Sequence, residues 1–303
     1  MKKIKVVLNP VAGRGYSAKA ETDICRFFEE EKVEFELQRT ERTWHAAEIA
    51  EEAVTNGFDT VVAAGGDGTT NEVINGLMAA KNNGHPGGML ALLATGSGSD
   101  FTFNVGMPSD LQEACRRIAK GQAKVVDLGK LTLDDQPPRY FDNQMGIGFD
   151  GVVTVEARKF KRLRGMALYL PVVLKSIFVS NKATRVTVDY DGEKLELSTI
   201  QISIANGARE GGGFFMTPGA KIDDGLFDIC IVEEVGKLEM LKLVPHFMKG
   251  THVEQDCTRV LQAKKVVIES EDNLIAHFDG ELLCTEGHRI ECEIIPQSLR
   301  VIY

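Results

Sequence analysis

The chain has 303 residues and a formal net charge of −9. This length suits about two domains with sizeable cores, and the negative charge argues against general nucleic-acid binding. Its six cysteines lack the Cys-x-x-Cys spacing of a zinc or redox site, so neither class of site is expected.

The sequence predicts no membrane span and no targeting signal. The N-terminal run MKKIK leads directly into a strand-like segment without the apolar core of a signal peptide. The longest apolar stretch, residues 166–179, is interrupted by Pro171 and Lys175 and is shorter than the ~20 residues that a spanning helix needs. We therefore expect a soluble, cytoplasmic protein.

Strands and helices alternate in residues 1–128. Apolar, β-branched runs predict strands, and the stretches between them have helical periodicity. The predicted strands are residues 4–8, 33–37, 60–64, 89–93 and 124–127. A capping-box pattern, Ser109-x-x-Gln112, predicts the start of one helix. The alternation is typical of a parallel α/β domain.

Three glycine-rich turns follow strands of this domain. They are Asn9-Pro10-Val11-Ala12-Gly13, Gly65-Gly66-Asp67-Gly68-Thr69-Thr70-Asn71-Glu72 and Ala94-Thr95-Gly96-Ser97-Gly98-Ser99-Asp100-Phe101. Glycine lets a ligand approach the main chain, and the helix after the second turn offers unpaired N–H groups. Because ligands bind beyond the carboxyl ends of strands in open α/β sheets, the turns predict one phosphate-binding edge.

Acidic residues accompany the predicted phosphate site. An anion such as Asp67 beside phosphates is unfavourable unless a cation intervenes, and Mg²⁺ is the natural mediator. Asp67, Asp100 and Asp127 all end or follow predicted strands of the first domain, so together they suggest an acidic Mg²⁺ network. Alternatively, Asp67 caps the following helix and Asp127 caps the end of its strand.

Residues 129–296 have a different pattern, with short β-rich runs and hairpin signals such as Tyr190-Asp191-Gly192-Glu193. Helical insertions are predicted near residues 152–180 and 236–249. We expect a mostly antiparallel β-sandwich. Its predicted strands are residues 130–133, 139–142, 185–189, 194–204, 227–232, 266–270, 274–277 and 289–295.

A basic segment precedes the apolar run 166–170. It contains five cations within residues 158–164, namely Arg158, Lys159, Lys161, Arg162 and Arg164. A basic stretch beside an apolar one suits peripheral docking on an anionic membrane surface, at the inner face of the membrane. The alternative is a solvated helix face with long, snorkelling side chains.

Asp279 is the candidate general base. It lies in the run Phe278-Asp279-Gly280-Glu281, where glycine permits a sharp turn that could direct the carboxylate into a cleft between the domains. The alternative is a hairpin turn without chemistry. His277 either lines the same site or packs in the core, and the six histidines form no metal-like cluster in the sequence.

The three turns, Gly146-Ile147-Gly148-Phe149-Asp150, residues 218–227 and Phe278-Asp279-Gly280-Glu281 together resemble the bacterial diacylglycerol kinase family. The wider group includes sphingosine and ceramide kinases. The Gly-Gly-Asp-Gly-Thr motif alone is shared with NAD kinases and phosphofructokinases, so the specificity lies in the ordered set. The resemblance implies a Rossmann-like, NAD kinase/phosphofructokinase-like first domain, to which residues 297–303 return, and an active site in the interdomain cleft.

The resemblance also implies an ATP- and Mg²⁺-dependent kinase that phosphorylates a lipid hydroxyl, with diacylglycerol converted to phosphatidic acid as the first candidate. Asp279 is then the proton acceptor, and Glu281, Asp67, Asp100 and Asp127 accompany it at the active site. The nucleotide contacts carried over by the resemblance are Asn9, Pro10, Val11, Ala12, Gly13, Thr40, Gly65, Gly66, Asp67, Gly68, Thr69, Thr70, Asn71 and Ser97.

A second Mg²⁺ site is implied by the same resemblance. Its ligands are the carbonyls of Lys221 and Leu226 and the carboxylate of Asp224, although this segment is equally compatible with an ordinary turn. The third glycine turn departs from the family pattern, because Ser97 replaces the usual Thr and Ser99 the usual Asn. This weakens any transfer of substrate identity.

Two other functions stay open. An NAD kinase would share the second glycine turn but would act on a soluble dinucleotide. A catalytically silent nucleotide-binding regulator would agree with the altered Ser97 and Ser99. The acyl chains of the acceptor and the oligomeric state, including a homodimer, also stay open.

Overall fold

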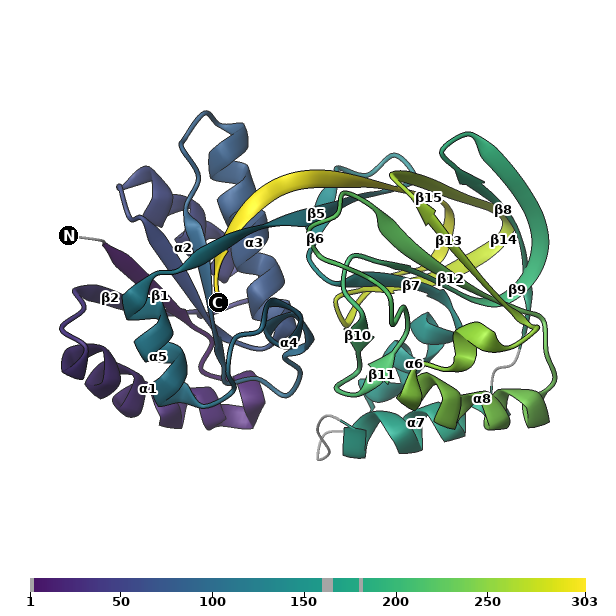
Figure 1. Ribbon diagram of the computed structural model, residues 1–303, viewed down its shortest axis with the longest axis horizontal. Helices are drawn as coiled ribbons and strands as arrows, with labels where there is room; N and C mark the ends of the chain where they lie inside the picture. The colour runs from purple at the N-terminus through teal and green to yellow at the C-terminus, as the bar shows by residue number, and fades with distance from the viewer. Residues whose placement is uncertain (1–2, 160–165, 180–181) are drawn as a thin grey trace. The chain divides into compact units, whose positions relative to one another are not determined.

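The computed structural model describes residues 3–159, 166–179 and 182–303, and the chain forms two compact units (Figure 1). Unit 1 comprises Met1–Val126 and Gln297–Tyr303, and unit 2 comprises Asp127–Pro296. The sequence predicted the first boundary two residues later, after residue 128, and the second at the same place, after residue 296.

Unit 1 is built on a parallel sheet. β1 (Ile4–Leu8) pairs with β2 (Phe35–Arg39) and β3 (Thr60–Gly65), and β3 pairs with β4 (Met89–Ala94). The end of β15 (Glu281–Ile302) pairs in parallel with β4. Every residue of β3 is buried, which is typical of a strand with both sheet faces covered.

Helices alternate with these strands. α1 packs with α5, and α2 packs with α3. The helices of unit 1 are α1 (Ala12–Glu30), α2 (His45–Thr55), α3 (Asp67–Asn82), α4 (Asp100–Val105) and α5 (Leu111–Lys120). The capping box predicted from Ser109 is wrong by one residue. Asp110 is the N-cap of α5, and its carboxylate accepts a hydrogen bond from Glu113 N at 2.9 Å.

Unit 2 is antiparallel, and two long strands organise it. One half of β9 (Glu193–Ala205) and one half of β14 (Lys265–Phe278) pair with β8 (Thr184–Tyr190), whereas their other halves pair with β7 (Gln144–Gly148). The four strands therefore close on themselves. The sequence predicted β14 as two strands, but the structure joins them through register shifts after Glu269.

The other strands of unit 2 are β5 (Ala123–Leu133), which begins in unit 1, β6 (Arg139–Phe141), β10 (Arg209–Glu210), β11 (Phe214–Phe215), β12 (Phe227–Glu233) and β13 (Thr258–Ala263). The sequence prediction missed β7, β10, β11 and β13. β7 contains two glycines, which are depleted in strands, and β10 and β11 are too short to show a period. The two strands predicted at residues 124–127 and 130–133 are one continuous β5.

Helices cover a second apolar cluster of unit 2. They are α6 (Phe149–Ala157), α7 (Met166–Val179), α8 (Lys237–Lys249) and the short η1 (His252–Glu254). Ile177 of α7 and Met240 of α8 pack in this cluster with Ile200 and Val232 of the sheet. Parallel pairing in unit 1 and antiparallel pairing in unit 2 confirm the predicted fold class. Over the described ranges, no helix is long and apolar enough to cross a bilayer.

Candidate functional site

The three glycine turns of unit 1 meet through their backbones. Gly96 lies against Gly66, where a Cβ on Gly96 would overlap the main chain of Gly66. Gly13 has a φ of 55° and lies against the carbonyl oxygen of Thr95. The N–H groups of Thr95 and Gly96 both donate to Gly65 O, at 3.0 and 2.7 Å. Such close approaches require glycine, so the predicted turns form one site lined by main chain.

Asn9 ties the first turn to the second. Its Nδ2 donates to Thr69 Oγ1 at 2.9 Å, and its Oδ1 accepts from Val11 N at 3.2 Å. Helix α3 begins directly after Gly66, which is its extended N-cap. The N–H groups of a first helical turn have no acceptor within the helix, and the positive end of the helix dipole lies at the same place. Both features favour an anion. The arrangement is suited to phosphate.

Asp67 connects the second and third turns. Its Oδ1 accepts hydrogen bonds from Asp100 N at 2.9 Å and Phe101 N at 3.5 Å, at the start of α4. Gly66, and not Asp67, is the N-cap residue of α3. The alternative prediction, in which Asp67 caps the helix that follows it, is therefore wrong. Asp67 instead holds the third turn, and with it Asp100, against the second.

Two further nucleotide candidates, Thr40 and Ser97, also belong to unit 1. Thr40 follows β2, is buried, and donates its N–H to Leu8 O at 2.9 Å, beside the first turn. Ser97 lies in the third turn, and its backbone nitrogen is 3.7 Å from the position of a Cβ on Gly66. Both residues therefore adjoin the glycine turns.

Asp127 does not end a strand of the first domain, so that prediction is wrong. It lies inside β5, fully buried, in unit 2. Its Oδ2 accepts from Gly225 N at 2.7 Å, and its own N–H donates to Ile222 O at 2.7 Å. Strand β5 continues past residue 127, and both the carboxylate and the N–H of Asp127 bond to the loop that carries Lys221, Asp224 and Leu226. Asp127 therefore supports that loop.

That loop has oxygen donors suited to Mg²⁺. Asp224 is exposed, and its Oδ1 accepts from Leu226 N at 3.2 Å. Asp228 is buried nearby, and its Oδ2 has no hydrogen-bond partner in the described part of the chain. Burial raises the pKa of Asp228, and the charge of Asp224 adds to the rise. An orphaned carboxylate oxygen beside a second carboxylate fits a cation, so the residues agree with the implied site.

Asp279 lies at the tip of the hairpin between β14 and β15. Asp279 and Gly280 have φ values of 44° and 77°, as in a type I′ turn. Asp279 is 4% exposed, and its carboxylate accepts hydrogen bonds from three backbone N–H groups at 3.0–3.1 Å, those of Asp142, Asn143 and Gln144. Asp279 therefore lies in a hairpin turn, and its carboxylate points inward, toward the backbone that supplies these three donors. Hydrogen bonds to a carboxylate stabilise its anionic form. Glu281 follows at once as the first residue of β15.

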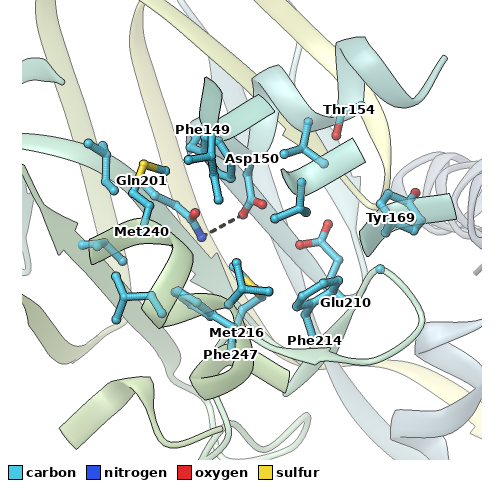
Figure 2. Close-up of a pocket in the computed structure, with 18 of the residues that line it drawn as sticks. Phe149, Asp150, Thr154, Tyr169, Gln201, Glu210, Phe214, Met216, Met240 and Phe247 are labelled. Atoms are coloured by element: carbon cyan, nitrogen blue, oxygen red, sulfur yellow. Dashed lines mark hydrogen bonds between the residues drawn. The ribbon is translucent and has the colours of Figure 1, made fainter. Parts of the chain in front are cut away.

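An apolar pocket with about 760 Å³ of atom-free space, partly open to solvent, lies within unit 2 (Figure 2). Its polar end is formed by Asp150, Glu210, Gln201 and His277. The lining also includes Gly280, which directly follows Asp279 in the chain. The walls come mainly from three helices and include Val153 of α6, Val173 and Ile177 of α7, and Met240, Leu243 and Phe247 of α8.

His277 lies between the two carboxylates of the polar end. Its Nε2 is 3.9 Å from Asp150 Oδ2 and its Nδ1 is 3.4 Å from Glu210 Oε1. Burial alone would lower the pKa of His277, but Glu210, Asp150 and Asp279 outweigh burial and raise it to about 9. Gln201 Nε2 donates to Asp150 Oδ2 at 3.1 Å (Figure 2).

The sequence prediction missed part of this cluster. Glu210 and Gln201 were not candidates, and no metal-like grouping was expected for the histidines, whereas the described residues include the group Asp150, Glu210 and His277. A signal was present for Glu210, because three glycines follow it directly in the chain. Nothing in the sequence marks Gln201.

The basic segment falls largely on residues 160–165, which lie outside the described residues. Of its cations, Arg158 and Lys159 are described, and Lys159 forms an ion pair with Glu156. The next helix, α7, exposes Phe178 and Val179 at its end, and Leu238 of α8 is also exposed. Lys237 Nζ donates to Phe178 O at 2.9 Å and so links the start of α8 to the end of α7.

Comparison with known proteins covers both units. Residues 3–131 match the diacylglycerol kinase catalytic domain family, and residues 143–303 match the YegS C-terminal NAD kinase beta sandwich-like domain family. A diacylglycerol kinase of Bacillus subtilis is 28% identical over 285 residues, covering 93% of this chain and 90% of that protein. The "Probable lipid kinase YegS-like" of Chromohalobacter salexigens is 33% identical over 252 residues, covering 82% and 78%.

Among solved structures, a diacylglycerol kinase from Bacillus anthracis str. Sterne is similar in fold. Its TM-score is 0.76 at 24% identity, over 100% of this chain and 96% of that chain. Together with the family matches, this confirms the α/β unit followed by a β-sandwich-like unit.

Proposed function

This chain belongs to the diacylglycerol kinase and YegS-like lipid kinase family, and we propose that it is an ATP- and Mg²⁺-dependent kinase that phosphorylates the free hydroxyl of a lipid. Diacylglycerol is the first acceptor to consider, because a relative is named diacylglycerol kinase. The observation that carries the proposal is the apolar pocket of unit 2, whose lining includes His277, two residues before Asp279, and Gly280, directly after it.

The phosphoryl donor binds at the glycine turns of unit 1. Backbone N–H groups of the second turn and the start of α3 hold its phosphates, and the Asn9 bond to Thr69 keeps the first turn beside them. Thr40 and Ser97 adjoin the same turns and contribute to holding the nucleotide. The close packing of Gly66 and Gly96 leaves no side chain to obstruct the phosphates.

The lipid acceptor binds in the pocket of unit 2. Its hydrocarbon chain packs on Val173, Ile177 and Phe247, and its hydroxyl lies at the polar end beside the hairpin that carries Asp279. A mainly apolar pocket with a few polar groups at one end matches an amphiphile. The same lining is poorly suited to a dinucleotide, whose charged phosphates would be desolvated there.

Asp279 accepts the hydroxyl proton as the acceptor oxygen attacks the γ-phosphorus and the bond from phosphorus to the bridging oxygen breaks. The three backbone donors hold the carboxylate in a fixed orientation. Glu281 follows the turn and adds negative charge beside it.

Mg²⁺ fits the carboxylate oxygens near the turns, and when bound it neutralises negative charge on the phosphates. Asp67 and Asp100, which the Asp67–Asp100 N bond holds together, are the residues that would bind it in unit 1. Asp224, with the carbonyls of Lys221 and Leu226, would hold a second, structural ion in unit 2, and Asp127 supports that loop through Gly225.

Peripheral association with an anionic membrane gives the enzyme access to its acceptor. The basic residues of segment 158–164 supply attraction to anionic lipids, and exposed Phe178, Val179 and Leu238 supply apolar contact next to helices that line the pocket. Sedimentation with anionic and neutral vesicles tests this. Binding only to anionic vesicles is expected, and equal binding to both, or to neither, would contradict it.

The test of the proposed function is phosphoryl transfer from γ-labelled ATP to acceptors in mixed micelles. Diacylglycerol, monoacylglycerol, phosphatidylglycerol, ceramide, sphingosine and undecaprenol are compared with NAD as a soluble acceptor. We expect labelled lipid, dependent on Mg²⁺, and a rate lower by roughly 10²–10⁴ in Asp279→Asn. Labelled NADP would make the protein an NAD kinase. ATP binding without transfer to any acceptor would favour a silent regulator.

A further inference from the structure

Glu72 of α3 is bonded to the start of α2, the neighbouring helix of unit 1. Its Oε2 accepts a hydrogen bond from Ala46 N at 3.1 Å. Ala46 lies in the first turn of α2, where the N–H groups have no acceptor within the helix. The N-cap residue of α2 is Trp44, whose indole side chain can donate a hydrogen bond but cannot accept one. Glu72 therefore supplies a capping carboxylate for α2 from the adjacent helix.

The same face of α3 packs closely on the start of α2. Gly76 lies one helical turn after Glu72, and a Cβ on Gly76 would overlap the carbonyl oxygen of Ala47. Glu72 is half-buried. Burial raises the pKa of its carboxyl group, whereas the backbone N–H groups of Trp44 and Ala46 act to lower that pKa. The carboxylate therefore faces the backbone at the start of α2.

Residues 40–46 are held against the glycine turns at both ends. At one end, Thr40 N donates to Leu8 O at 2.9 Å, directly before the first turn. At the other end, Ala46 is bonded to Glu72, which belongs to the helix that starts at the second turn. A short segment that is fixed at both ends has few conformations open to it. The bond from Ala46 to Glu72 therefore sets the position of this segment relative to the phosphate-binding turns.

Bonds within residues 40–46 and to α2 keep the segment compact, although one of its residues is strained. Glu41 N donates to His45 Nδ1 at 3.1 Å, and the Arg42 guanidinium donates to both carboxylate oxygens of Glu48, at 2.7 and 2.5 Å. Trp44 has a left-handed backbone with a φ of 64°, which is unfavourable for a bulky side chain. Such a conformation persists only where surrounding contacts enforce it. Loss of the bond to Glu72 should therefore let the segment relax.

We propose that Glu72 is a positioning residue for the phosphoryl donor, because it caps α2 from α3 and so holds residues 40–46 as one wall of the nucleotide site. This inference rests on the proposed kinase function. Residues 40–46 follow β2 at the carboxyl edge of the parallel sheet, where the glycine turns also lie. With the phosphates at the turns, the ribose and base extend along this edge. A wall that is ordered beforehand lowers the cost of binding them.

Calorimetric titration with MgATP compares the wild type with Glu72→Met and Glu72→Gln. Glu72→Met keeps the length of the side chain but removes both acceptor oxygens, and we expect it to weaken ATP affinity about tenfold, because binding must then order the segment. Glu72→Gln keeps one oxygen that can accept from Ala46 N, so it should bind ATP nearly as tightly as the wild type. In steady-state kinetics the KM for ATP should rise in Glu72→Met, while the KM for dioleoylglycerol stays unchanged.

Tryptophan fluorescence tests the same wall in the wild type. Trp44 is the single tryptophan of the chain and lies within residues 40–46, so its emission reports on this segment. We expect MgATP to change the Trp44 emission of the wild type, and Glu72→Met to shift the emission before any ATP is added. Emission that stays the same while calorimetry shows ATP binding to the wild type would overturn the proposal, whether or not Glu72→Met folds.

The matched control is Glu51→Met, which removes the 2.9 Å hydrogen bond from Asn83 Nδ2. That bond also joins α2 to α3, but at the C-cap of α3, away from the glycine turns, so ATP affinity should stay unchanged. Unaltered affinity in Glu72→Met, or an equal loss in Glu51→Met, would overturn the proposal and leave the kinase function intact. Equal rises in the KM for ATP and for dioleoylglycerol would show a merely structural role and overturn it too. A wild type that binds no ATP would overturn both.

Discussion

The glycine turns of unit 1 and the pocket of unit 2 are built in opposite ways. The turns meet through main chain, at Gly13, Gly66 and Gly96, and each follows directly on a strand. The pocket is made of side chains from three helices and several strands that are far apart in the sequence. A site made of backbone tolerates almost no substitution at its closest contacts, whereas a site made of side chains can be reshaped to suit another ligand. If the proposed function holds, we expect donor binding and acceptor choice to change independently.

Gly96→Ala should have the largest effect, because the new Cβ would overlap the backbone of Gly66. Relieving this overlap would require the backbone of one of the two turns to move. We expect the free energy of unfolding to fall by about 3 kcal/mol and ATP affinity to fall by roughly 100-fold or more. Urea unfolding and calorimetric titration with ATP measure both. Gly236→Ala is the control, since a Cβ there meets no atom within 4 Å. Unaltered ATP binding in Gly96→Ala would break the comparison.

The pH dependence of stability should report on the charged end of the pocket. Burial alone would lower the pKa of His277, but the charges of Glu210, Asp150 and Asp279 outweigh burial and raise this pKa from 6.5 to about 9. A raised pKa stabilises the fold fully below about pH 6.5, and the stabilisation is lost as pH rises through about 9. We expect a loss of up to about 3 kcal/mol over this range, measured by urea unfolding at several pH values.

In His277→Gln the same pH range should show a much smaller loss, because the titrating group has gone. His288→Gln, an exposed histidine of β15, is the control and should keep the wild-type slope. If His277→Gln and the wild type share one slope, His277 is not the group that titrates over this pH range.

Val173→Phe tests the pocket as the acceptor site. Val173 lines the pocket from α7, and a larger side chain there should take space from the lipid chain. The KM for the lipid should rise about 10- to 100-fold, equivalent to roughly 1–3 kcal/mol, while the affinity for ATP changes little. Steady-state kinetics with each substrate varied in turn measure this. Val260→Phe, on exposed β13, is the control, and a rise in KM for ATP instead would contradict the assignment of the two sites.

The smallest effect concerns the start of α5 in unit 1. Asp110→Ala removes the hydrogen bond from Glu113 N and should lower the free energy of unfolding by about 1 kcal/mol. Ser109→Ala should change it little, because Asp110 is the N-cap. Thermal unfolding of both variants measures the difference, and the reverse order would restore the capping box first predicted from Ser109.

The same contrast explains what the sequence could predict. The strands of unit 1 and the glycine turns were predictable, because a β-branched run that ends in glycine indicates a strand followed by a turn from the local sequence alone. Asp127 was misplaced because the sequence does not show that β5 continues beyond it. The pocket could not be predicted, since Gln201 and Glu210 come together with His277 only after β9, β10 and β14 have packed. The inward turn of Asp279 likewise depends on N–H groups about 135 residues earlier in the chain.

The most direct test of the account is to map where the lipid acceptor binds. A monoacylglycerol with a photoreactive group in its acyl chain is crosslinked to the protein, and the labelled peptides are identified by mass spectrometry. The account predicts adducts on α7 and α8, at residues such as Val173 and Phe247, that excess unlabelled acceptor suppresses and MgATP does not. Adducts confined to the glycine turns of unit 1, or suppressed by MgATP alone, would contradict it.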